Sequence, residues 1–194
     1  MAYGKAIELF LVNGTADSLI TAELSNWNGK AIKIPRTEVS GCNRDDVKGA
    51  GVYFLICQED DGTDSVYIGE AENVQDRLVQ HLREYQSGKE KYYWNTAVIF
   101  VGRDLNKALI RYLENRFVEI ARECGRYAVL TKNTYKNTVM KESQIASMEE
   151  FIDNVKILIN TLGYKVLVPA PKATDDTVYL YCKGSGASAT GFVS

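Results

Sequence analysis

Five side chains in the middle of this 194-residue chain have types and spacings that could support chemistry. They are two phenols, a guanidinium, the one imidazole of the chain and a carboxylate, at Tyr53, Tyr67, Arg77, His81 and Glu114. A guanidinium binds anions through paired N–H donors, and imidazole and phenol groups can transfer protons. Such a set is useful only if the fold brings it together, so the elements that carry it come next.

The two tyrosines lie in short apolar runs, GVYFLI at residues 51–56 and SVYIG at residues 65–69. Alternation along a strand places Tyr53 on one face and its immediate neighbours on the other. If the runs pair as an antiparallel hairpin, one register puts both phenols on one face beside Gly51 and Gly69. Glycine in a strand often marks the close approach of another group. Taken alone, the runs also fit ordinary cross-strand aromatic packing.

A helix is predicted to follow, because Asn73 is a good N-cap and apolar residues recur from Val74 at helical spacing. Arg77 and His81 lie four residues apart and so project from adjoining positions of one helix face. A cation and a titratable ring thus stand together shortly after the second glycine. Each residue by itself would more commonly be a solvated surface group.

A second, longer helix is predicted over residues 105–123, with Asp104 as its cap. Lys107, Arg111 and Glu114 share one polar face of this helix. By itself, Glu114 is half of a surface ion pair of small energetic value.

The ordered set resembles the catalytic core of the GIY-YIG nuclease superfamily. The matching features are GVY, then YIG, an arginine eight residues later at Arg77, His81 four residues on, and LEN around Glu114. The resemblance is strongest over residues 51–133 and fainter over 5–40 and 145–168, which look like flanks in bacterial members. Val52 replaces the isoleucine of the family, and Glu70 adds a carboxylate directly after YIG.

The resemblance implies an α/β (α+β) fold with a small central antiparallel three-stranded sheet flanked by helices. It also implies a DNA endonuclease with a one-metal mechanism, in which Glu114 holds Mg²⁺ or Mn²⁺ and Arg77 binds the scissile phosphate. Tyr53 would be the general base with Tyr67 beside it, and His81 is the alternative base or proton relay, with an ordinary pKa suited to that work. An asparagine, Asn133 or in its place Asn137, would hold the site together.

DNA is the partner that the resemblance implies, and the charge distribution favours it. Residues 77–137 contain twelve Lys or Arg against six Asp or Glu, whereas the whole chain has a net charge of −2. We expect the phosphate backbone to be bound by basic and aromatic side chains near the site, at Arg77, Lys107, Arg111, Lys91 and Trp94. Lysines and arginines also occur simply as solvated helix faces.

Two other functional classes remain open from the sequence. The first is a nucleic-acid-binding module of the same fold that cuts little or needs a partner, and the second is an interaction scaffold. A module that had lost activity would be expected to lack one of the five reactive side chains, and this chain has them all. A homodimer is also open.

Composition and patterning divide the chain into a β-rich extension at residues 1–48, a nuclease-like domain at 49–168, and a linker with the start of a truncated module at 169–194. Strands are expected at 7–12, 19–24, 30–34, 92–101, 166–168 and 178–182, and a helix at 148–162. The four cysteines are scattered, which indicates reduced thiols rather than a zinc site. We predict a cytoplasmic protein without a membrane segment.

Overall fold

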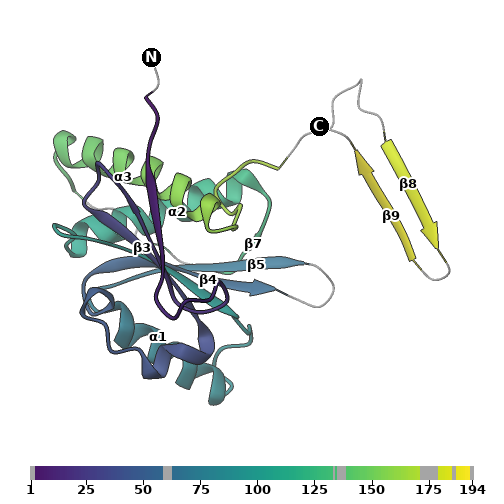
Figure 1. Ribbon diagram of the computed structural model, residues 1–194, viewed down its shortest axis with the longest axis horizontal. Coiled ribbons are helices and arrows are strands. Elements are labelled where there is room, and N and C mark those ends of the chain that lie inside the picture. Colours follow the sequence, from purple (N-terminus) through teal and green to yellow (C-terminus); the bar gives the residue numbers. More distant parts are fainter. Residues whose placement is uncertain are drawn as a thin grey trace.

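A computed structural model of the chain describes residues 3–58, 63–132, 134, 139–170, 179–184 and 187–192. Its main body is one seven-stranded sheet with helices on both faces (Figure 1). The strand order is β1-β2-β3-β6-β4-β5-β7, and all neighbours pair antiparallel except β5 and β7, which are parallel. The fold is therefore α+β, as predicted at that level.

The sheet is larger than the predicted three strands. The three predicted core strands do lie side by side, as β6 (Thr96–Gly102), β4 (Gly51–Gln58) and β5 (Asp64–Ala71). The N-terminal meander extends them, because β3 pairs with β6 along its whole length. Its strands are β1 (Ile7–Leu11), β2 (Ile20–Leu24) and β3 (Gly29–Pro35).

The reason for this extension lies in β3 itself. Ala31, Ile32 and Ile34 are all at most 1% exposed, so both faces of this strand are covered. A strand that is apolar on both faces belongs in the interior of a sheet and not in a separate two-sided meander. The predicted boundary near residue 48 therefore falls within one continuous sheet.

Three helices cover the two faces. Helix α1 (Val74–Gln86) and the short 3₁₀ turns η1 (Arg36–Gly41) and η2 (Asp45–Val47) pack on one face, and α2 (Lys107–Cys124) and α3 (Glu142–Thr161) pack on the other (Figure 1).

The N-termini of α1 and α2 show which side chains cap these helices. The Asn73 side chain accepts the Asp76 backbone N–H, which confirms the predicted start of α1. The predicted cap Asp104 is wrong, because Asn106 accepts the backbone N–H groups of Ala108 and Leu109 at the start of α2. Asn106 lies directly before the first helical turn, where an N-cap side chain can reach the free N–H groups.

The remaining elements are smaller. The short strand β7 (Ala128–Val129) borders β5 near its beginning and leaves residues 67–71 without a paired neighbour strand on that side among the described residues. The predicted strand at residues 166–168 is a turn that the Val168 N–H closes on the Lys165 carbonyl.

The last described segment forms a sheet of its own. β8 (Tyr179–Gly184) pairs antiparallel with β9 (Ala187–Phe192), so the glycine- and alanine-rich end of the chain supplies a second strand. No helix among the described residues has both the length and the apolar character that crossing a membrane requires.

Candidate functional site

The two tyrosines lie on one face of the β4–β5 hairpin, which confirms the predicted register. Tyr53 is opposite Gly69 and Leu55 is opposite Tyr67, so the phenols are diagonal neighbours whose ring centroids are 6.3 Å apart. A Cβ at Gly69 would lie 2.4 Å from the Tyr53 hydroxyl oxygen. Glycine is needed here because the Tyr53 phenol occupies the space of a side chain.

Helix α1 brings the imidazole to these phenols. His81 is fully buried, and its Nε2 lies 2.9 Å from the Tyr53 hydroxyl. Its ring also packs edge-on against Tyr67, with centroids 5.2 Å apart. The common reading of a lone helical histidine as a surface group is therefore wrong here, because α1 turns this residue toward the sheet.

Burial changes the acid–base properties of the ring. Burial and the nearby cations Arg77 and Arg36 lower the pKa of His81 to about 3, although Glu84 acts in the opposite direction. The expected match between an ordinary imidazole pKa and neutral pH is therefore lost. His81 is a neutral imidazole at neutral pH, able both to donate and to accept one hydrogen bond.

Arg77, one turn before His81 on α1, faces both phenols. Burial raises the pKa of Tyr53 well above 10 and also raises that of Tyr67, and Arg77 opposes this by stabilising each phenolate through charge and hydrogen bonding. Its Nη1 also lies 3.4 Å from Oε2 of Glu84, seven residues later on the same helix. The guanidinium is half-buried and is thus held in place on the phenol side of the sheet.

Glu114 reaches the same place from helix α2. Its carboxylate is 7% exposed, and its charge raises the pKa values of both Tyr53 and Tyr67. Burial and the nearby Glu70 carboxylate raise the pKa of Glu114 to about 7, against the opposing effect of Lys107 and Arg111. Although α2 packs on the opposite face of the sheet from α1, the charge of this carboxylate acts on both phenols, at the edge where β5 lacks a paired strand among the described residues.

The negative charge of Glu70 is compensated by two basic side chains of α2. The Lys107 ammonium lies 3.0 Å and the Arg111 Nε 3.8 Å from its two oxygens, and the Glu70 carboxylate is nearly buried. Two carboxylates and two cations therefore sit together at this edge. The repulsion of phosphate that Glu70 would cause is balanced by these two basic side chains, which are consequently less available as independent phosphate ligands.

One predicted substrate ligand lies in the core and not at the surface of the site. Trp94 is fully buried and stacks its ring on the Arg36 guanidinium at 4.5 Å, so it presents no surface for base stacking. The prediction of Trp94 as a substrate ligand is wrong in this respect, because the aromatic approach to β6 belongs to the core. Lys91 is exposed on the same segment, and Asn133 and its alternative Asn137 lie outside the described residues.

The structure adds residues that no sequence pattern selects. Glu90 contacts Nδ1 of His81, although it sits in the polar run Lys-Glu-Lys. Thr131 accepts the Ile68 N–H at 2.8 Å and donates to the Ile68 carbonyl at 2.7 Å, so its side chain continues the edge pairing of β5. Only long-range folding places either residue, and we find no local signal that indicates them.

Two further carboxylates, those of Glu84 and Glu90, lie near His81. Ligand atoms of His81, Glu84 and Glu90 lie within 4.8 Å of one another. Both nitrogens of the ring are already engaged, by Tyr53 and by Glu90, and Glu84 is paired with Arg77. We therefore describe this group as a hydrogen-bond network.

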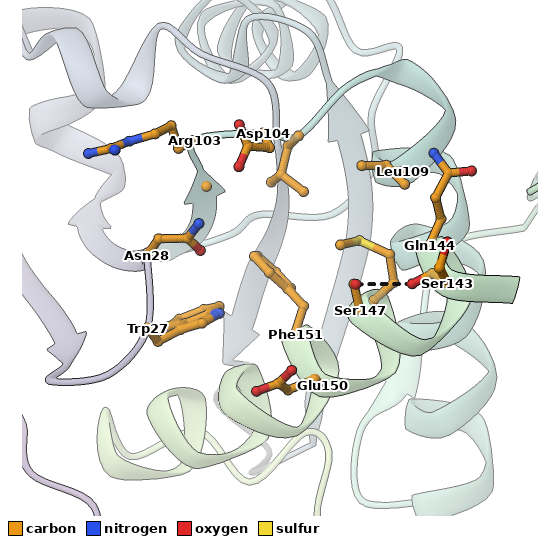
Figure 2. Close-up of a pocket in the computed structure, with 13 residues that line it drawn as sticks. Trp27, Asn28, Arg103, Asp104, Leu109, Ser143, Gln144, Ser147, Glu150 and Phe151 are labelled. Atoms are coloured by element: carbon orange, nitrogen blue, oxygen red, sulfur yellow. Dashed lines mark hydrogen bonds between the residues drawn. The ribbon is translucent and has the colours of Figure 1, made fainter. Parts of the chain in front are cut away.

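A pocket of about 430 Å³ lies elsewhere, between the end of β6 and the first turns of α3 (Figure 2). Its floor is apolar, with the Phe151 ring meeting Trp27 edge-on at 4.8 Å, and its rim carries Asp104, Ser143 and Glu150. Its lining includes none of the predicted catalytic residues that the structure describes. The reactive side chains instead form a largely buried cluster at the β5 edge.

At a significant level, no protein-family model, curated protein or solved structure matches this chain.

Proposed function

We propose that this chain is a metal-dependent DNA endonuclease that uses the GIY-YIG type of active site. The observation that carries the proposal is the nearly buried position of Glu114, from which its charge raises the pKa values of Tyr53 and Tyr67, the two phenols that face Arg77. An ordinary surface ion pair would not require a carboxylate to be buried beside two phenols. The same set of side chains is the one that the sequence motifs select.

The carboxylate suits a divalent cation. Glu114 is nearly buried, and its pKa is raised to about 7 by burial and by Glu70, so a bound cation would relieve an unfavourable negative charge. Mg²⁺ or Mn²⁺ commonly binds through one or two carboxylates with water completing the shell. When bound, the ion would supply Lewis-acid activation of the scissile phosphate.

The residues of the chain itself account for binding and proton transfer. Arg77 would donate to the non-bridging phosphate oxygens, and a donor aimed at developing charge typically contributes about 10²–10³ in rate. Tyr67 is more accessible than Tyr53 and would orient the phosphate and the attacking water. Lys91 is the exposed basic residue from the predicted set that remains suited to contacting the DNA backbone.

Tyr53 is the proposed base, and it needs help because its pKa is raised. In the proposed step the Tyr53 O–H bond breaks and the proton passes by way of Nε2 of His81, 2.9 Å away, to solvent, while Arg77 stabilises the phenolate. The phenolate takes a proton from the attacking water, the new O–P bond forms and the P–O3′ bond breaks. The leaving oxygen acquires a proton from solvent.

The test is nicking of supercoiled plasmid in Mg²⁺ or Mn²⁺. The parent should convert the plasmid to the nicked form, and Glu114→Gln should reduce the rate at least about 100-fold. The matched control is Glu119→Gln on the same helix, whose exposed carboxylate pairs only with Arg116 among the described contacts. A parent that leaves the plasmid intact, or a Glu114→Gln variant that nicks equally fast, would contradict the proposal. A parent that binds DNA without cutting would favour the non-catalytic module.

A further inference from the structure

His81 is held at both ring nitrogens, and this fixes what the ring can do. Nε2 faces the Tyr53 hydroxyl on β4, and Nδ1 contacts the Glu90 carboxylate from the segment between α1 and β6. A neutral imidazole has one N–H donor and one acceptor nitrogen, so the partner at Nδ1 determines the role of Nε2. A carboxylate can only accept, and it therefore requires the proton to be on Nδ1.

We propose that Glu90 is a positioning residue that holds His81 in the Nδ1–H tautomer, so that Nε2 is free to accept the proton of Tyr53. This inference rests on the proposed function for its catalytic consequence. The hydrogen-bond geometry that carries it, with a phenol, an imidazole and a carboxylate in sequence, does not depend on that function.

Glu90 is itself held in place. It is a mostly buried carboxylate, 12% exposed, and the nearby Tyr92 hydroxyl acts to lower its pKa. The Tyr92 ring in turn stacks on Tyr67 with centroids 5.7 Å apart, so the segment is fixed to the same face of β5. A carboxylate packed in this way has little freedom to leave Nδ1.

The other charged and titratable neighbours of His81 do not take over this role. They are Tyr67 on β5, Arg77 and Glu84 on α1, Arg36 on η1, and Tyr92 beside Glu90. Arg77 and Arg36 oppose a positive charge on the ring, whereas Glu84 favours it, and both ring nitrogens are already bonded to other groups.

A pH dependence follows from proton counting. Burial and Glu84 raise the pKa of Glu90 to about 7. Above that pH, the pair of Glu90 and His81 holds one proton, on Nδ1, and Nε2 is an acceptor. Below it, the pair holds a second proton. When that proton resides on Glu90, its O–H can donate to Nδ1, and the hydrogen of the ring then lies on Nε2, which cannot accept from Tyr53.

The experiment uses the fact that His81 is the one histidine of the chain. With ¹⁵N-labelled histidine, the long-range ¹H–¹⁵N spectrum reports the tautomer of this ring without an assignment step, and it needs no DNA or metal. At pH 8.5 we expect the Nδ1–H tautomer in the parent, conversion to Nε2–H in Glu90→Ala, and retention of Nδ1–H in Glu90→Asp.

Glu84→Gln is the matched control, because Glu84 pairs with Arg77 and acts on Glu90 by raising its pKa. At pH 8.5 Glu90 is ionised with or without Glu84, so the tautomer should be unchanged. A parent in the Nε2–H form at pH 8.5, or a Glu90→Ala variant that keeps Nδ1–H, would overturn the inference. A nearly unfolded Glu90→Ala protein would be recognised by circular dichroism, and Glu90→Gln then provides the comparison.

Nicking supplies the second readout. Glu90→Gln should lower kcat by about 10² or more at pH 8 with little change in KM, and Glu90→Asp should recover most of it. The parent rate should rise with pH near 7, whereas the Glu90→Gln rate should not. If no variant nicks DNA but the tautomer follows Glu90, the proposed function fails and the positioning role stands. An unchanged kcat in Glu90→Gln would show that the positioning of His81 by Glu90 does not contribute to the rate.

Discussion

Replacing Gly69 with alanine tests directly whether Tyr53 lies over the second glycine of the motif. The new Cβ would be 2.4 Å from the Tyr53 hydroxyl oxygen and 2.6 Å from its Cζ, where van der Waals contact requires about 3.5 Å. The ring is buried, and His81 bonds its hydroxyl, so it cannot move away freely. Overpacking of a core in this way costs about 1–3 kcal/mol, and the lower chain entropy of alanine offsets about 0.5–1 kcal/mol of it.

The net loss of about 1–2 kcal/mol is measurable by urea denaturation. With an m-value of about 2 kcal/mol/M, the midpoint should fall by about 0.5–1 M. Gly49→Ala is the matched control, because a Cβ there meets nothing within 4 Å and its φ is not positive. Its free energy of unfolding should change by no more than an ordinary surface substitution does, about 0.5 kcal/mol.

A double-mutant cycle isolates the contact itself. In a Tyr53→Leu background the shorter side chain leaves the space beside Gly69 open, so Gly69→Ala should cost much less than in the parent. An equal cost in both backgrounds would refute the reasoning, because the loss would then come from the strand and not from the phenol.

Three further predictions concern other parts of the site and its support. Thr131→Val should lower the free energy of unfolding by about 1–3 kcal/mol in urea denaturation, because the Ile68 N–H and carbonyl lose their partner, whereas Thr131→Ser should cost much less. The pKa of Glu114 is raised from 4.5 to about 7, so its carboxyl binds a proton more tightly in the folded chain than in the unfolded chain. The stability that results is present below pH 4.5 and is lost as the pH rises through 7. Glu114→Gln without divalent ions should therefore stabilise by about 1–3 kcal/mol at pH 8 and little at pH 4, and equal gains at both pH values would contradict the shift. Arg36→Gln should cost about 1–2 kcal/mol in thermal or urea unfolding, because the guanidinium lies within 4.8 Å of three aromatic ring centroids, and an unchanged midpoint would show that these contacts contribute nothing.

The sequence by itself determined the local parts of the site. The period of two along β4 and β5 allowed Tyr53 and Tyr67 to share one face in one hairpin register, which is the register observed, and the Asn73 cap predicted where α1 begins. The spacing of Arg77 and His81 then followed from the four-residue repeat of the helix. These features depend on neighbours within a few residues, so residue types and spacing were enough to predict them.

Tertiary structure decided what those groups can do. Burial lowered the pKa of His81 and enclosed Trp94, and long-range contacts brought Glu90 to the imidazole and Glu70 to Lys107. The N-terminal strands joined the central sheet through the pairing of β3 with β6, two strands about 60 residues apart in the chain. Desolvation and the placement of charges depend on which distant segments pack together. A polar residue such as Glu90, in a run of charged neighbours, therefore acquires its role only when the whole chain has folded.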